Sequence, residues 1–195
     1  MSDPSGDIDA RLTAALERVG EAMRVQLWDA ARRLGLTPTQ VQILLRLRAD
    51  PPEHRRVGAL ASRLDVTHPT ISDGVSALTR KGLVERESEG RRAPLALTAR
   101  GRETAAEAAG WSDPIRDRLA ELGEADKEVA LGLVFDLIAG LQRDGVITVT
   151  RMCATCRFFR PEAHPGEPRP HHCALLEIPL AETELRIDCP EHQPA

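Results

Sequence analysis

The stretch LASRLDVTHPTISDGVSALTRKGLVERESEGRRAPLALTARG, residues 60–101, decides the fold predicted for this chain. Its first half predicts two short helices joined by a tight turn at Leu64-Asp65-Val66, and Thr67 is placed to cap the second helix. Apolar residues that would form the seam between these helices recur at helical spacing: Leu60, Leu64, Ile71, Val75 and Leu78. After Gly82 the apolar period changes to two, which predicts a two-stranded hairpin with its turn at residues 89–92.

Polar side chains gather at the start of the second predicted helix, away from the apolar seam. This is the geometry of a helix-turn-helix, whose second helix lies in the major groove of DNA. Hydroxyl groups there bond to base edges or phosphates, and Asp73 can accept a hydrogen bond from cytosine. Arginines at the hairpin tip would reach the minor groove or the phosphates. The predicted DNA-binding residues are Thr67, His68, Pro69, Thr70, Ser72, Asp73, Ser76, Arg91 and Arg92.

The charge distribution supports a polyanionic partner. The chain carries a formal net charge of -4, but the segment from His54 to Arg102 holds ten basic and five acidic side chains and is therefore +5. The remainder has 16 basic and 25 acidic residues, which makes it -9. A basic surface in an otherwise acidic protein can bind nucleic acid while the rest of the chain maintains solubility.

Helical periodicity continues on both sides of this stretch. It predicts an N-terminal dimerisation helix within residues 8–36, a winged helix-turn-helix DNA-binding domain at 37–101 and C-terminal dimerisation helices at 102–145. The run VALGLVFDLIAGL, residues 129–141, is apolar on nearly every face and needs more than one covering surface. In a short chain a second copy can provide that surface, so we expect a homodimer of a mainly α fold with a small β-wing.

The order of these elements resembles the MarR family of winged-helix transcriptional regulators over roughly residues 8 to 144. Leu60 to Val66 match the family's positioning helix and turn, and Thr67 to Thr79 match its recognition helix. Lys81-Gly82-Leu83-Val84 matches the entry to the wing, and Leu97-Thr98-Ala99-Arg100-Gly101 matches its exit. The acidic-x-Arg element that the family carries near the wing tip falls on Glu89-Gly90-Arg91, with glutamate in place of the commoner aspartate.

The resemblance implies a homodimeric repressor that binds double-stranded DNA and is not an enzyme. A two-fold dimer should prefer a pseudo-palindromic operator with half-sites about one helical turn apart. Family members often hold a small-molecule effector between the dimerisation and DNA-binding regions, where Trp28 and Trp111 could line a pocket; the competing interpretation is that both are core or interface residues. Most members end soon after the last dimerisation helix, whereas this chain continues for about 45 residues.

That C-terminal addition, residues 146–195, contains the only four cysteines of the chain: Cys153, Cys156, Cys173 and Cys189. This segment contains seven prolines, the first of them Pro161, and few apolar residues that could form a core. We therefore expect a small irregular module that needs a metal to fold. Thiolates in one Cys-x2-Cys knuckle and two single positions can converge on one metal centre. Two disulfides, a Cys153–Cys156 redox switch and a catalytic oxidoreductase are the competing interpretations.

The sequence is compatible with two kinds of metal centre, a zinc ion and an iron-sulfur cluster. Base rates and the knuckle favour zinc, to which the sequence gives a slight preference. The all-thiolate set, the lack of a second knuckle and the Cys189-Pro190 step favour an iron-sulfur cluster. His171, His172 and His192 flank the thiols, and each could replace one ligand or lie outside the ligand set.

The composition places the chain in the cytoplasm. No window approaches 18 uncharged apolar residues, so no membrane partner is expected, and the N-terminus lacks the pattern of an export signal. The sequence thus predicts a DNA-binding regulator whose four-cysteine site senses redox or metal status. The alternative is a metal- or electron-carrying protein that uses its helices only to dimerise.

Overall fold

The computed structural model describes residues 7–88, 93–147 and 151–195 of the chain. It is mainly helical, with small antiparallel sheets, and it divides into two compact units, Met1–Arg118 and Leu119–Ala195. Within the described ranges, no helix has both the length and the apolar character needed to cross a membrane.

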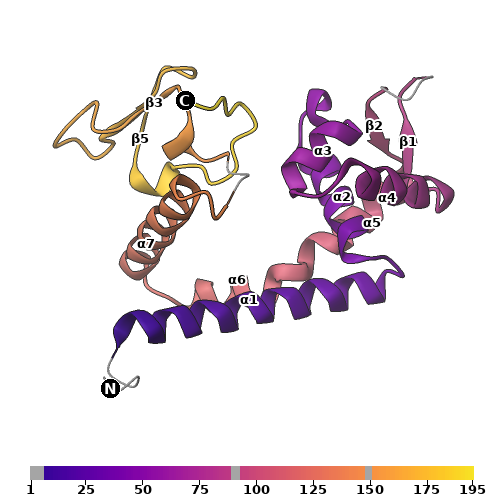
Figure 1. Cartoon of the computed structure of the whole chain (residues 1–195), viewed down its shortest axis with the longest axis horizontal. Helices are drawn as coiled ribbons and strands as arrows, with labels where there is room; N and C mark the ends of the chain where they lie inside the picture. Colours follow the sequence, from indigo (N-terminus) through magenta and orange to yellow (C-terminus); the bar gives the residue numbers. More distant parts are fainter. Residues whose placement is uncertain (1–6, 89–92, 148–150) are drawn as a thin grey trace. The chain divides into compact units, whose positions relative to one another are not determined.

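The first unit contains the helix-turn-helix and the wing that the sequence predicts (Figure 1). Its elements are α1 (Ile8–Arg33), α2 (Pro38–Ala49), η1 (Pro52–His54), α3 (Val57–Leu64), α4 (His68–Arg80), β1 (Val84–Arg86), β2 (Leu95–Leu97), α5 (Ala99–Ala109), η2 (Gly110–Ser112) and α6 (Asp113–Ala120), of which α6 ends in the second unit. The strands pair antiparallel, with Val84 opposite Leu97 and Arg86 opposite Leu95. The predicted mainly α fold with a small β-wing is therefore confirmed.

Side-chain caps fix where these helices begin. Thr37 forms a capping box with Gln40: the Thr37 hydroxyl accepts from the Gln40 N–H at 3.2 Å, and the Gln40 side chain accepts from the Thr37 N–H at 3.2 Å. The Thr98 hydroxyl accepts from the Gly101 N–H at 3.0 Å. Between α3 and α4, Asp65 adopts a left-handed backbone with φ 51°, which ends α3 and makes the tight turn.

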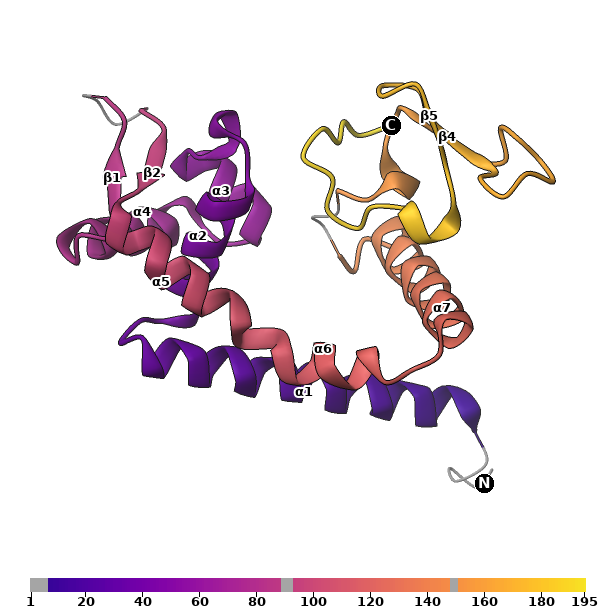
Figure 2. The same cartoon turned by 180° about the vertical axis from the view of Figure 1, so that it is seen from behind.

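The core of the first unit surrounds α2, against which α3, α4, α5 and β2 pack (Figures 1 and 2). The largest fully buried side chains of this core are Ile43, Leu44, Leu47, Leu60, Ile71, Leu78 and Leu95. Full burial of one such side chain contributes about 1.5–3 kcal/mol. This core needs no ligand to account for its stability.

A close backbone approach positions α5 against that core, and a buried ion pair positions α3. A Cβ at Gly101 would lie 1.9 Å from the backbone oxygen of Leu83, so only glycine allows α5 to start directly against the residue before the wing. The guanidinium Nε of Arg63 lies 3.1 Å from Oδ2 of Asp50, and both side chains are only 4% exposed. This ion pair joins α3 to the end of α2.

The second unit consists of helix α7 (Glu124–Arg143) and the cysteine module. The module was expected to be irregular, but it contains an antiparallel sheet in the order β3-β4-β5. Its elements are η3 (Cys153–Thr155), β3 (Phe159–Arg160), β4 (His171–Cys173), β5 (Ile178–Leu180) and η4 (Glu182–Glu184). Prolines are tolerated because the strands are very short and Pro179 lies on the edge strand β5.

Helix α7 packs against the module and gives it a small apolar core. Phe135 and Ala139 of α7 cluster with Met152, Leu180 and Leu185, and Met152 is fully buried. The sequence assigns α7 to the dimerisation helices at 102–145, whereas in the structure it belongs to the compact unit of the cysteine module. The side of α7 that carries Val129, Leu133 and Leu137 stays exposed.

Candidate nucleic-acid interface and thiolate site

Helix α4 presents the predicted DNA-reading residues to solvent. Val75 and Leu78 are buried in the core, which turns the opposite face of the helix outward. On that face Ser72 is half-buried, and the following residues are exposed: Thr67, His68, Pro69, Thr70, Asp73 and Ser76. The structure therefore brings all the predicted residues of the recognition helix together on one accessible surface.

Local hydrogen bonds orient several of these side chains. The hydroxyls of Thr67 and Thr70 lie 2.8 Å apart, and the Thr67 hydroxyl also accepts from the Thr70 N–H at 3.4 Å. The Ser76 hydroxyl donates to the backbone oxygen of Ser72 at 2.8 Å, which leaves its lone pairs available as acceptors. The Thr67–Thr70 contacts hold the first turn of α4 in a defined geometry, and the Ser76 contact fixes a hydroxyl farther along the helix.

Of the ten basic side chains that the sequence places in the segment from His54 to Arg102, six are exposed, Arg55 and Arg63 are not, and two lie outside the described residues. Exposed cations lie at Arg56, Arg80, Lys81, Arg86, Arg100 and Arg102. Arg63, counted in the basic segment from the sequence, is instead buried in its ion pair with Asp50. Arg91 and Arg92, predicted at the wing tip, lie outside the described residues, as does the Glu89-Gly90-Arg91 element.

In the second unit all four cysteines line one cavity, which is the convergence that the sequence predicts for a metal centre. Cys153 and Cys156 come from η3 and its end, Cys173 ends β4, and Cys189 lies near the end of the chain. The cavity has a volume of about 30 Å³, and its other lining residues are Phe159, Leu176, Leu180 and Arg186. The four thiols are free, so the disulfide interpretation is not what the structure contains.

Backbone hydrogen bonds between distant segments hold the cysteines around the cavity. The Cys153 N–H donates to the Arg186 oxygen at 2.9 Å, and the Arg186 N–H donates back to the Cys153 sulfur at 3.3 Å. The Cys189 N–H donates to the Arg151 oxygen at 2.8 Å. Within the knuckle, the Cys156 N–H donates to the Cys153 oxygen at 2.9 Å. The last residues of the chain are thereby fastened beside the knuckle.

Two of the four thiols, Cys153 and Cys189, have the electrostatics of latent metal ligands rather than of activated nucleophiles. Burial raises the pKa of the Cys153 thiol above its usual value. Burial, followed by a hydrogen bond to Glu191, does the same to the pKa of Cys189. Redox-active cysteines normally have a lowered pKa, so the raised pKa of Cys153 disfavours a Cys153-x2-Cys156 oxidoreductase. A bound metal would displace the protons and stabilise the thiolates.

Arg186 covers the Cys189 side of the cavity. Its guanidinium lies 3.6 Å from the Cys189 sulfur and donates to Glu191 at 2.9 Å. A cation at this position offsets the negative charge that thiolate ligands bring to a metal centre. Sequence reasoning missed Arg186, because nothing in the spacing of the cysteines marks an arginine three residues before Cys189.

The flanking histidines have other partners, and none of them lines the cavity. The His192 ring nitrogen Nε2 lies 2.9 Å from the Thr155 hydroxyl, and burial lowers the pKa of His192. His172 Nδ1 lies 3.2 Å from His164 Nε2. The ligand set that the structure offers at the cavity is therefore four cysteines.

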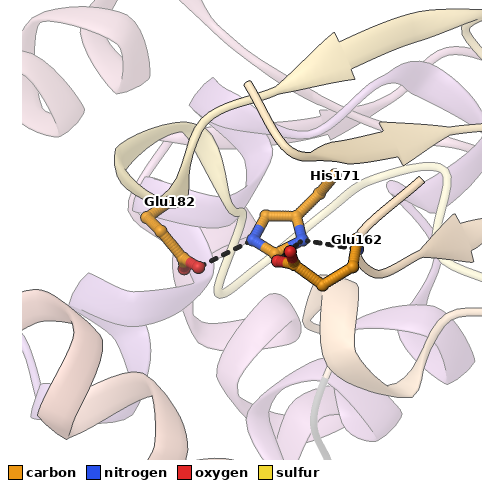
Figure 3. A group of neighbouring side chains, drawn as sticks. All are labelled: Glu162, His171 and Glu182. Carbon is orange, nitrogen blue, oxygen red and sulfur yellow. Dashed lines mark hydrogen bonds and ion pairs between the residues drawn. The ribbon is translucent and has the colours of Figure 1, made fainter. Parts of the chain in front are cut away.

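The buried His171 lies between two carboxylates, Glu162 and Glu182, which approach opposite ring nitrogens (Figure 3). The ligand atoms of the three residues lie within 4.8 Å of one another, which satisfies a distance criterion for a cation site. However, His171 Nε2 is 2.7 Å from Glu182 Oε1, and Nδ1 accepts from the Glu162 backbone N–H at 3.3 Å. Both ring nitrogens of His171 already have hydrogen-bond partners, so we interpret this group as a set of hydrogen bonds that stabilises β4.

Residues 34–93 match the sequence profile of the MarR family. A MarR family protein from Mycobacterium tuberculosis, Rv2887, is 29% identical, with 69% of this chain and 98% of that chain covered and a TM-score of 0.50. The transcriptional regulator PA3341 is 25% identical, with 68% and 98% covered and a TM-score of 0.54. No curated protein matches the sequence.

A third solved structure is the complex of MepR from S. aureus with DNA, at 21% identity. Its alignment covers 66% of this chain and 97% of that chain, with a TM-score of 0.57, and it is evidence for the fold alone. The first unit thus has a winged helix-turn-helix fold, and within it residues 34–93 are similar in sequence to the MarR family.

Proposed function

We propose that the chain is a homodimeric, sequence-specific repressor that binds duplex DNA through α4 and the wing, and that its cysteine site binds a metal centre and reports on redox or metal status. The observation that carries the DNA-binding part is the single exposed face of α4, which gathers the predicted base-reading side chains beside a wing and exposed arginines. The solved DNA complex of a protein with this fold supports the same conclusion.

The homodimer is supported by apolar surface that one chain leaves uncovered. On α1, Leu12, Leu16 and Val19 are 55%, 45% and 50% exposed, and they follow one another at helical spacing. Exposed apolar residues in a row along a helix mark a protein interface. Leu133 of α7 is 67% exposed and adds a second uncovered surface in the other unit. A second copy of the chain would cover both.

The metal part of the proposal rests on four thiols that line one apolar cavity. The elements that present them are short and are joined mainly by backbone hydrogen bonds, and the apolar cluster beside them is small. Such a module gains most of its stability when ligands from separate segments share one ion or cluster. The winged helix is complete without it, which favours a regulatory role for the addition.

Titration of a labelled duplex against the full chain at several salt concentrations tests DNA binding. We expect the logarithm of the binding constant to fall linearly with the logarithm of salt, and Arg86→Gln to reduce that slope by about 1 through the loss of one phosphate contact. Thr70→Val and Ser72→Ala should change the preferred sequence by about 1–3 kcal/mol per lost base contact. Thr104→Val on α5 is the control and should leave preference unchanged.

Two outcomes would reject parts of this function. If the chain shows no duplex binding at physiological salt, the result would favour the alternative function, a metal- or electron-carrying protein that uses its helices only to dimerise. If the bound duplex is transcribed faster in a purified assay, the protein is an activator and the repressor assignment fails.

The mass of the purified chain in solution tests the dimer. We expect twice the mass of 21.3 kDa at low micromolar concentration. Leu16→Glu and Leu133→Glu should shift the equilibrium toward single chains, because each places a charge in an interface. Glu17→Gln, on the same helix but off the apolar row, should not.

A further inference from the structure

The arrangement of the four sulfurs is informative about which metal centre the cavity accepts. A tetrahedral zinc ion holds each sulfur about 2.3 Å from the metal, which places the sulfurs about 3.8 Å from one another. All four cysteines lie in the described part of the chain, yet they do not belong to a group of three or more possible ligand atoms within 4.8 Å of one another, as Glu162, His171 and Glu182 do. The thiols face one cavity but are spread too widely for one ion.

The space between the sulfurs agrees with this spread. The cavity of about 30 Å³ is roughly twice what one buried water requires. Thiolates that surround a single zinc ion leave no comparable space, because they lie in contact with the metal and nearly in contact with one another. A cluster needs this space for its own iron and sulfide atoms, and each cysteine then binds a separate iron.

The lining also suits a cluster. Phe159, Leu176 and Leu180 provide apolar walls, which limit solvent access to the bound group. N–H groups that point at cluster sulfurs, and nearby cations, stabilise the negative charge of an all-thiolate cluster. Arg186 supplies both, since its backbone N–H donates to the Cys153 sulfur and its guanidinium lies 3.6 Å from the Cys189 sulfur.

We infer that the cavity binds an iron-sulfur cluster of the four-iron type, with Cys153, Cys156, Cys173 and Cys189 each bound to one iron. This inference rests on the proposed metal site and replaces zinc, the centre that the sequence alone slightly favours. On binding, each thiol loses its proton to solvent and its sulfur forms one bond to iron. Arg186 is a positioning residue that offsets the charge of the cluster.

The test is the composition and visible spectrum of the full chain purified without oxygen. We expect a brown protein with a broad absorption near 400 nm and about four iron and four sulfide per chain. Cys173→Ser should lower the iron content severalfold, whereas Ala154→Ser, an exposed position between two ligands, should keep it. Duplex binding, measured on the same preparation, reports separately on the DNA-binding function.

Other compositions overturn the inference in distinguishable ways. One zinc per chain in a colourless protein would leave the proposed metal site intact and reject the cluster. Two iron and two sulfide per chain would reject the four-iron assignment. A chain that holds neither metal, even after reconstitution with iron and sulfide and separately with zinc, would reject both the cluster and the metal site.

Discussion

The two units of the chain differ in the size of their apolar cores and therefore in what stabilises their folds. The first unit buries a continuous set of branched apolar side chains around α2 and closes its helices with side-chain caps. The second has an apolar cluster of few residues and instead directs four thiols into one cavity. Large cores are stable without ligands, whereas small modules need a metal or crosslinks. The two units should therefore respond differently to the same perturbations.

The largest expected effect of a single substitution is at Gly101. In Gly101→Ala, the new methyl group would meet the Leu83 oxygen at 1.9 Å, so α5 must move away from the core. We expect a loss of more than about 5 kcal/mol in the unfolding free energy of the first unit, measured by denaturant titration. Gly58→Ala is the matched control, because a methyl group there meets nothing within 4 Å. It should be neutral or stabilise α3 by about 1 kcal/mol.

The next largest effect concerns the buried ion pair. Arg63→Met removes the cation 3.1 Å from the buried Asp50 carboxylate, which keeps the more distant Arg46 at 4.0 Å, and should cost about 3–5 kcal/mol in the same titration. Arg18→Met removes a cation from an exposed pair with Glu21, where the arginine is 82% exposed. That change should cost no more than about 0.5 kcal/mol. Equal losses for the two variants would contradict the structural role assigned to Arg63.

The smallest effect is expected at Arg186 and concerns the second unit. Arg186→Gln removes a positive charge 3.6 Å from the Cys189 sulfur. A cation beside a cluster favours the added electron, so the variant should have a lower reduction potential, by on the order of tens of millivolts. Arg169→Gln, which removes the partner of Glu184 in the same unit, should leave the potential unchanged. An unchanged potential in Arg186→Gln would reject its proposed role.

Local signals were sufficient to predict the first unit. Thr67 caps α4 as predicted, because a cap depends on residues within one turn of the helix. The seam residues Ile71 and Leu78 are fully buried for the same reason, since helical spacing places them on one face. The exposed face of α4 follows directly from that seam.

Features set by contacts between distant segments could not be predicted in this way. Arg63 was counted as part of a basic surface, but its burial depends on Asp50, which is thirteen residues earlier in the chain. The sheet of the cysteine module pairs Phe159 with Cys173, and such short strands leave no readable period-two pattern. Packing of Met152 against α7 likewise depends on the tertiary fold.

Hydrogen exchange of the full chain, loaded with the proposed metal centre and again after treatment with a chelator, tests the contrast between the units most directly. We predict that backbone protection is lost in residues 151–195, where ligands from separate segments share the centre, and is retained in α2, α4 and α5. Equal protection of residues 151–195 in both states would contradict a metal-dependent module. Loss of protection in α2, α4 and α5 would contradict a winged helix that is stable by itself.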